Sequence, residues 1–117
     1  MATPHAPVPV NSLSFAHEVL KSDLPVFIDV TAEWCPPCKA AAPVVEELAR
    51  KHAGRLKVVV IDGEEAADLV ATLGVRGFPT FLGVFGGEIV ARQAGFGSKR
   101  GLEALAEKLL AHTMEKA

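Results

Sequence analysis

The stretch Trp34-Cys35-Pro36-Pro37-Cys38-Lys39 contains the only two cysteines of this 117-residue chain. Two residues separate them, so the two thiols can close a small disulfide ring and open it again. A strand-like apolar run at residues 25–30 precedes this stretch, and a helix-like run at residues 40–51 follows it. The pair therefore lies at a strand-to-helix junction, where a CxxC spacing indicates a redox motif.

The composition predicts a single domain over residues 1–117. Half of the residues are hydrophobic, which suffices for one continuous core. The formal net charge is -2 and no basic block occurs, which argues against nucleic-acid binding. The N-terminus has no basic segment followed by an apolar one, and no window approaches the roughly 18 apolar residues of a membrane span. We therefore expect a cytoplasmic protein, although a chain whose signal peptide had been removed would start in the same way.

The hydrophobic pattern predicts alternating strands and helices. In chain order we expect a loose Pro-rich arm or short edge strand in residues 1–12, a helix over 14–20, a strand over 26–30, a helix over 40–51, a strand over 56–61, a helix over 66–73, two strands between 80 and 91, and a last helix after 98.

Several local signals set the limits of these elements. Ser14 and Ser98 are expected N-caps, and Gly86-Gly87 is a two-residue hairpin signal. Pro43 should kink the helix that contains it. The strand over residues 26–30 is apolar on both faces except at Asp29, as in a central strand covered by helices on each side. The fold class is therefore three-layer α/β/α, with a mixed central sheet that has a parallel core and an antiparallel C-terminal hairpin.

From Phe15 onward, the order of the motifs resembles the thioredoxin family. The residues that carry the resemblance are Asp29, Ala32-Glu33-Trp34-Cys35 leading into Pro37-Cys38-Lys39, Pro43, Val75-Arg76-Gly77-Phe78-Pro79-Thr80 and Gly95. The resemblance implies the thioredoxin fold, with a cis peptide bond before Pro79 beside the cysteines.

The two cysteines would have different roles. A thiolate attacks a disulfide, whereas a free cysteine with a pKa of about 8.5 is mostly protonated at neutral pH. Cys35 lies where a helix begins, and the unpaired amides and the positive end of the helix dipole there should lower its pKa. By the resemblance, Cys35 is the nucleophile that forms a mixed disulfide with a substrate. Cys38 is then the resolving thiol, and we expect it to be the more buried of the two.

The position of Asp29 in an apolar strand requires an explanation, because burying a carboxylate costs free energy unless the group is paired or neutral. The resemblance implies that it removes the proton from the resolving cysteine, and we predict that desolvation raises its pKa. A structural carboxylate bonded to a cap or a lysine is the alternative. The lysine that faces this carboxylate in many family members would fall at Val58, and Lys57, one residue away, should point to the opposite face.

The resemblance also implies a docking surface for substrates around Cys35. Phe78 beside Pro79 would pair its backbone with an extended segment, in the manner of an added strand. The expected substrate-binding residues are Trp34, Pro36, Pro37, Phe78, Pro79, Gly95 and Phe96. Pro36 departs from the glycine of the commonest thioredoxin motif. Core packing is the alternative for Phe96, and Phe27, Phe81 and Phe85 are interpreted as core or hairpin residues.

Other interpretations of the cysteines are weaker. A structural bridge closing so short a loop would constrain the unfolded chain little. Zinc normally takes four ligands, but the four histidines are scattered and no second CxxC occurs, so we expect no metal site. A c-type haem would need His where this chain has Lys39. The histidines should be ordinary surface residues.

The resemblance implies a thiol-disulfide oxidoreductase that reduces cytosolic protein disulfides and maintains redox homeostasis. Such a protein needs no bound cofactor, works as a monomer and receives electrons from an NADPH-dependent flavoprotein, thioredoxin reductase. A narrow-specificity reductase or an oxidase/isomerase with the same fold stays open. So does a non-catalytic protein-binding module that uses the apolar rim around Cys35.

Overall fold

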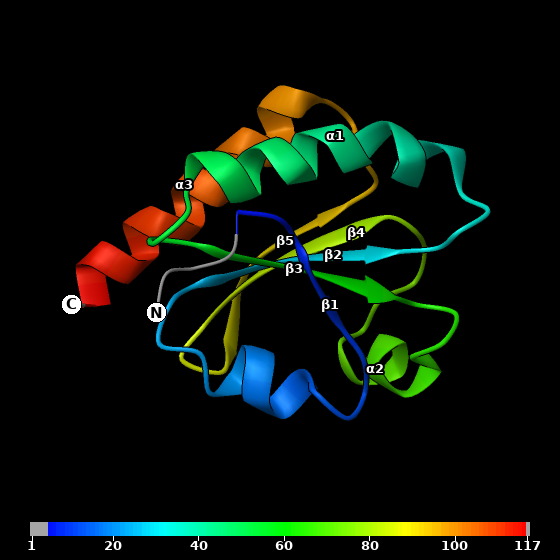
Figure 1. Cartoon of the computed structure of the whole chain (residues 1–117), viewed down its shortest axis with the longest axis horizontal. Coiled ribbons are helices and arrows are strands. Elements are labelled where there is room, and N and C mark those ends of the chain that lie inside the picture. Colours follow the sequence, from blue (N-terminus) through cyan, green and yellow to red (C-terminus); the bar gives the residue numbers. More distant parts are fainter. Residues whose placement is uncertain (1–4, 117) are drawn as a thin grey trace.

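The computed structural model describes residues 5–116, and its strands and helices follow the predicted order (Figure 1). The elements are β1 (Val8–Val10), the short π-helix η1 (Ala16–Leu20), β2 (Val26–Thr31), α1 (Pro36–Lys51), β3 (Lys57–Asp62), α2 (Ala67–Thr72), β4 (Thr80–Phe85), β5 (Glu88–Ala94) and α3 (Lys99–Lys116).

The sheet has the mixed topology predicted from the sequence. Its strand order is β1-β3-β2-β4-β5, in which β1, β3 and β2 are parallel and β4 and β5 run antiparallel to their neighbours. β2 is the central strand. The expected edge strand is present as β1, whereas residues 1–4 of the expected arm lie outside the described part of the chain.

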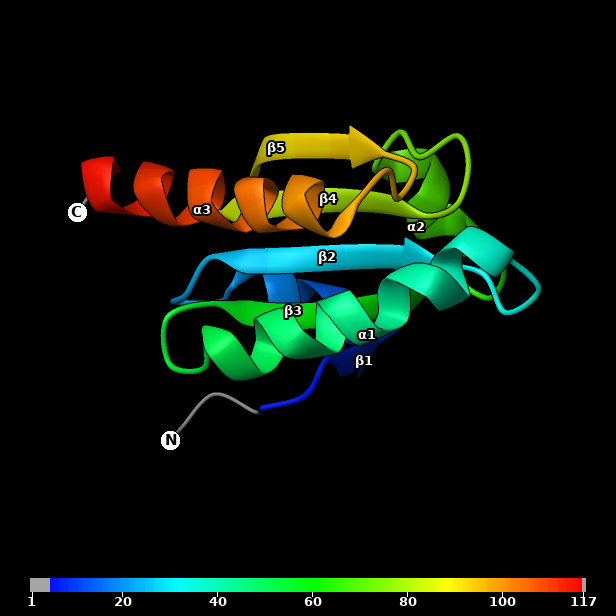
Figure 2. The same cartoon turned by 90° about the horizontal axis from the view of Figure 1, so that it is seen from above.

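Helices cover both faces of the sheet. α1 and α3 pack on one face, while η1 and α2 cover the other (Figures 1 and 2). Alternation along β2 divides its side chains between two cores. Val26, Ile28 and Val30 point to the η1 and α2 side, and Phe27 points to the α1 and α3 side. Asp29 therefore lies on the α1 side, and this register places it below the helix that contains the cysteines.

The hairpin and the last helix are built as predicted. Gly86 and Gly87 have φ of 61° and 80°, and two positive φ values are typical of a type I′ turn, which glycine adopts without a steric penalty. Ser98 Oγ accepts the Gly101 amide at 3.1 Å and so caps α3.

The start of the first helix differs from the prediction. Ser14 does not cap it, because η1 begins after Phe15 without any side-chain cap. Asn11 Oδ1 accepts the amides of Leu13 and Ser14, both at 2.9 Å, in the turn that precedes the helix. The Ser14 hydroxyl instead accepts the Asn11 amide at 3.1 Å. An asparagine side chain bonded to the backbone two residues on forms its own turn, which displaces the serine cap.

One histidine is also placed differently from the prediction. His52 at the end of α1 is buried, and its Nδ1 lies 3.1 Å from Arg55 Nη2. Because a guanidinium only donates, Nδ1 is the acceptor and the ring is neutral. Burial, followed by the charges of Arg55 and Lys51, lowers the His52 pKa. His52 is thus a core residue at the helix end, not a surface one.

Candidate active site

Cys35 is the N-cap of α1 and forms a disulfide with Cys38, with their Cα atoms 5.2 Å apart. The Cys38 amide donates to Cys35 Sγ at 3.3 Å. Pro36 and Pro37 occupy the first two helical positions and have no amide hydrogen, so Cys38 supplies the first amide that can reach the sulfur. This amide and the helix dipole would stabilise a thiolate on Cys35 once the ring is reduced.

Both cysteines are almost fully buried in this oxidised ring. Cys35 is 2% exposed and Cys38 is 3% exposed, so the expectation that Cys38 would be the more buried residue is wrong for this state. The two cysteines and Ala32 form a small apolar cluster, and Phe78 packs against it. The loop that contains Phe78 therefore helps to shield the disulfide from solvent.

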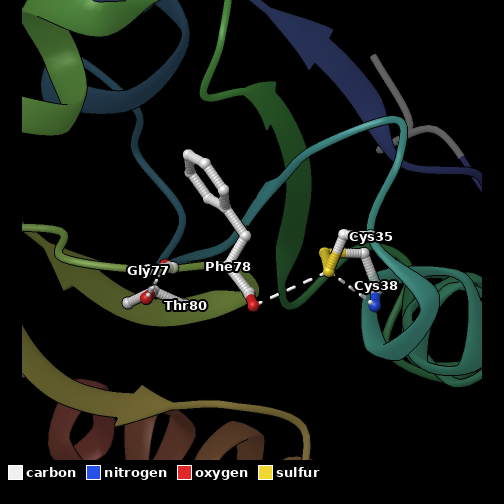
Figure 3. Close-up of a disulfide and its surroundings, with 5 residues drawn as sticks. All are labelled: Cys35, Cys38, Gly77, Phe78 and Thr80. Carbon is white, nitrogen blue, oxygen red and sulfur yellow. Dashed lines mark hydrogen bonds between the residues drawn. A yellow bond between two sulfur atoms is a disulfide. The ribbon is translucent and has the colours of Figure 1, made fainter.

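The loop before β4 presents its backbone to the disulfide. The Phe78-Pro79 peptide bond is cis, as the resemblance implied. Figure 3 shows the Phe78 carbonyl pointing toward the disulfide, with its oxygen 3.6 Å from Cys35 Sγ, while the ring points away from the sulfur. Thr80 Oγ1 donates to the Gly77 carbonyl at 2.8 Å and the Gly95 amide donates to the Pro79 carbonyl at 2.8 Å, which holds the loop in place.

The aromatic residues of the expected docking surface divide into two groups. Trp34 is 64% exposed and meets the half-buried Phe78 edge to face, with ring centroids 6.4 Å apart. Phe96 is half-buried and packs against the core between the sheet and the α1 and α3 helices. Phe27 and Phe81 are fully buried, as predicted, and Phe85 packs at the edge of the same core.

Asp29 is buried beneath this site without a cationic partner. It is 4% exposed, and its Oδ1 has no hydrogen-bond partner within residues 5–116. Desolvation raises its pKa from the ordinary 3.8 to about 7, as predicted from the sequence. Asp29 and Cys38 both line one cavity of about 120 Å³, so the carboxyl group and Cys38 border the same space.

Lys57 points away from Asp29, as the strand register predicts. Its Nζ bonds to Glu18 Oε1 at 2.7 Å and to the Glu18 carbonyl at 2.9 Å on the η1 side of the sheet. Val58 lies on the Asp29 side and is buried with Phe27. The carboxylate therefore lacks a neighbouring charge that would lower its pKa.

The sequence interpretation missed two residues near the site. A Cβ on Gly63 would overlap the Phe78 ring, so any other residue at this position would require that ring to shift. Arg92 reaches from β5 to the end of α2, donating to the Leu73 carbonyl at 2.7 Å and the Gly74 carbonyl at 3.4 Å. The glycine signal is visible in the sequence, but the close approach that requires it is a tertiary contact.

Residues 5–116 contain no group of three or more histidine, cysteine or acidic side chains that could hold a metal ion. None of the described helices is long and apolar enough to cross a membrane.

The fold and the chain itself are similar to known proteins. The family model described as Thioredoxin matches residues 6–108. A thioredoxin of Pseudomonas aeruginosa is 44% identical over 97 residues, covering 83% of this chain and 90% of that protein. Thioredoxin 1 of Nostoc is 39% identical over 101 residues, covering 86% and 94%. This chain belongs to the thioredoxin family.

The structural comparison agrees with this assignment. A mutant thioredoxin from Halobacterium salinarum superposes with a TM-score of 0.81 at 30% identity, covering 93% of this chain and 96% of that one. Thioredoxins are protein-disulfide oxidoreductases that need no cofactor, so this chain is a thiol-disulfide oxidoreductase, and Cys35 and Cys38 form its redox-active disulfide.

Pro36 is the departure from the commonest thioredoxin motif. Pro36→Gly is expected to make the reduction potential of the Cys35-Cys38 disulfide less negative by about 10–20 mV. Glycine gives the open dithiol more conformations than proline does, which disfavours ring closure by about 0.4–1 kcal/mol. For this two-electron couple, 30 mV corresponds to about 1.4 kcal/mol. Redox titration of both proteins measures the difference. A shift below about 10 mV, or one toward more negative potentials, would contradict the prediction.

Proposed function

We propose that Cys35 is the attacking thiolate, Cys38 the resolving thiol and Asp29 the base in the reduction of protein disulfides. The Cys35 thiolate attacks one sulfur of the substrate disulfide. The substrate S–S bond breaks, a Cys35–substrate disulfide forms and the other substrate sulfur leaves as a thiolate. The observation that carries this proposal is the position of Cys35 at the N-cap of α1, where the Cys38 amide donates to its sulfur.

The second step regenerates the ring seen in the structure. Cys38 gives its proton to Asp29 within their shared cavity and attacks Cys35 Sγ, so that the Cys35-Cys38 disulfide forms and the second substrate thiolate leaves. Two electrons pass from the protein to the substrate. A carboxylate with a pKa of about 7 is well matched to accept a proton near neutral pH. Because both cysteines are in one turn of helix, the step is intramolecular and fast.

Substrate binding would use the surface around the Phe78 carbonyl. This carbonyl can pair with the backbone of an extended substrate segment. The exposed Trp34 ring offers apolar area beside it, and the positive φ of Gly95, 80°, allows close approach of the backbone. Pro36, Pro37 and Pro79 would line the floor of the contact. Phe96 packs partly against the core, so only the exposed part of its ring would contact a substrate.

The electron source and the setting of the protein are part of the same proposal. An NADPH-dependent flavoprotein reductase would reduce the Cys35-Cys38 disulfide, and the protein would act as a cytoplasmic monomer with disulfide-containing proteins as substrates. Titration in a glutathione buffer tests the direction of electron flow. A potential below the glutathione poise of the cytosol supports a reductase, and one well above it would favour an oxidase or isomerase.

A trapping experiment separates the roles of the two cysteines. The Cys38→Ser variant can form the mixed disulfide but cannot resolve it, so we expect a covalent adduct with an oxidised substrate such as insulin. The adduct should run as a higher band on a non-reducing gel and disappear with dithiothreitol. The Cys35→Ser variant is the matched control and should form at least about tenfold less adduct, because it lacks the activated sulfur. Equal trapping by both variants would overturn the assignment.

A further inference from the structure

A cavity of about 390 Å³ lies next to the cis-Pro loop, on the β5 side of the site. Phe78 and Pro79 form one wall, and β5, the second strand of the hairpin, forms another. The lining residues are Gly74, Arg76, Gly77, Phe78, Pro79, Thr80, Arg92, Ala94 and Gly95. Arginine supplies both of the charged side chains in this lining, and no carboxylate is among them.

Neither arginine is neutralised by a carboxylate. Arg76 is exposed, and its side chain makes no hydrogen bond or ion pair within the described chain. Arg92 is held in place by the Leu73 and Gly74 carbonyls, which are neutral acceptors. The Arg92 guanidinium is therefore ordered before any ligand binds, while its positive charge stays uncompensated, a combination that favours binding of an anion.

The charges on the opposite side of the disulfide are different. A cavity of about 350 Å³ there is lined by Cys38, Glu33, Asp62 and Lys39, among others. This side has two carboxylates and one ammonium group, whereas the β5 side has two guanidinium groups. A negatively charged side chain beside the reacting cysteine is thus attracted to the β5 side.

We propose that the cavity lined by Arg76 and Arg92 binds an acidic side chain of the protein substrate, close in sequence to the cysteine that Cys35 attacks. This inference rests on the proposed function, because it requires a substrate segment at the Phe78 carbonyl. That carbonyl is 3.6 Å from Cys35 Sγ, and Phe78 also lines the cavity. An extended chain advances about 3.3 Å per residue, so a glutamate two or three residues from the substrate cysteine lies about 7–10 Å along the segment from the attacked sulfur, and longer side chains extend this span.

Short oxidised peptides of equal length test the proposal. Each peptide strand has one cysteine, and two identical strands are linked through it by a disulfide. The three peptides differ only at the second and third positions on both sides of the cysteine, which are Glu, Gln or Lys. Pre-reduced protein is mixed with each peptide in a single turnover, quenched with acid and analysed for released thiol. We expect the second-order rate constant to be about fivefold higher for the Glu peptide than for the Gln peptide, and lowest for the Lys peptide, because the attraction at this half-open surface is modest.

Substitutions of the two arginines test whether the preference for the Glu peptide arises in the cavity. Arg76→Gln should lower the Glu/Gln ratio toward one, and because Arg76 supports no other group this variant is expected to fold normally. Arg92→Gln should act in the same direction, and Arg92→Lys, which retains the charge, should keep more of the preference. Arg50→Gln is the matched control, since it removes the same charge from the far end of α1 and should leave the ratio unchanged. Raising the ionic strength to about 1 M should abolish the preference.

Two outcomes would overturn the proposal. One is equal rate constants for the Glu and Gln peptides, and the other is a Glu preference that survives in both Arg76→Gln and Arg92→Gln. In either case reduction of all three peptides would still support the proposed function. Failure of the protein to reduce any peptide would instead count against both.

Discussion

Replacing Cys35 with Ser is expected to lower the protein-catalysed part of insulin reduction by about 10³-fold or more, so that the observed rate falls to that of dithiothreitol alone. The hydroxyl cannot form the mixed disulfide, and Cys38, the other cysteine of the chain, has no second thiol left that could release a substrate bound to it. The measurement is the precipitation rate of the insulin B chain at equal protein concentration.

The same experiment separates catalysis from simple binding. A protein-binding module with incidental cysteines would keep its effect on insulin after the substitution, so equal rates for the wild type and the variant would contradict the oxidoreductase assignment. Thermal unfolding of the Cys35→Ser variant should be compared with that of reduced wild type, because both lack the disulfide. Similar transitions would show that loss of activity reflects the missing sulfur and not an unfolded chain.

Replacing Asp29 with Asn is expected to stabilise the oxidised protein at pH 8 by about 3 kcal/mol. A pKa near 7 in the folded protein against 3.8 in the unfolded chain means that ionising Asp29 opposes folding by about 4 kcal/mol at high pH. The amide of the variant cannot ionise, so the free-energy cost of ionisation is absent. Burying the polar atoms of the amide offsets part of the resulting increase in stability. Urea unfolding of the oxidised forms, in which neither cysteine titrates, measures the difference.

The pH dependence tests the cause of this gain. Between pH 3.8 and about 7 the folded wild type binds more protons at Asp29 than the unfolded chain does, so this residue's contribution makes stability fall as pH rises through that range. The advantage of Asp29→Asn should therefore be absent below pH 3.8, where only the cost of burying the amide remains, grow toward pH 7 and then level off. Asp23→Asn at an exposed site is the matched control and should change stability by less than about 0.5 kcal/mol at every pH. A gain independent of pH would rule out ionisation as its cause.

The same variant tests the catalytic role proposed for Asp29. In a single turnover, Asp29→Asn should slow the resolution of the mixed disulfide more than its formation, because only the second step transfers a proton from Cys38. Unchanged kinetics of both steps would leave Asp29 as a destabilising but inert carboxylate.

Much of the fold could be predicted from local sequence signals. The Gly86-Gly87 turn, the Ser98 cap and the strand on both sides of Asp29 all depend on backbone conformation or on the period of apolar residues, which short segments determine. The opposite directions of Lys57 and Val58 followed from the alternation of a strand.

Other features depended on contacts between distant segments. Ser14 is a good capping residue, but the turn that Asn11 forms after β1 uses the Ser14 hydroxyl, and η1 begins without a side-chain cap. His52 is buried because the packed end of α1 covers it, and the Phe78 loop closes over Cys35 as well as Cys38. Arg92 lies 19 residues beyond the Leu73 carbonyl to which it donates, so no local pattern could predict this bond.

The sequence by itself determined the chemistry of this protein: two thiols at the start of a helix, a carboxylate in the preceding strand and a proline before a later strand, in an order that identifies the family. These signals are short in range, because they arise from spacing and from backbone preference. Only the tertiary structure decided the surroundings of that chemistry, namely the burial of the disulfide, the cavity that Asp29 and Cys38 both line, and the two guanidinium groups beside Pro79. Burial and charge at a site are sums over side chains from several elements, and those sums exist only once the sheet and helices have packed.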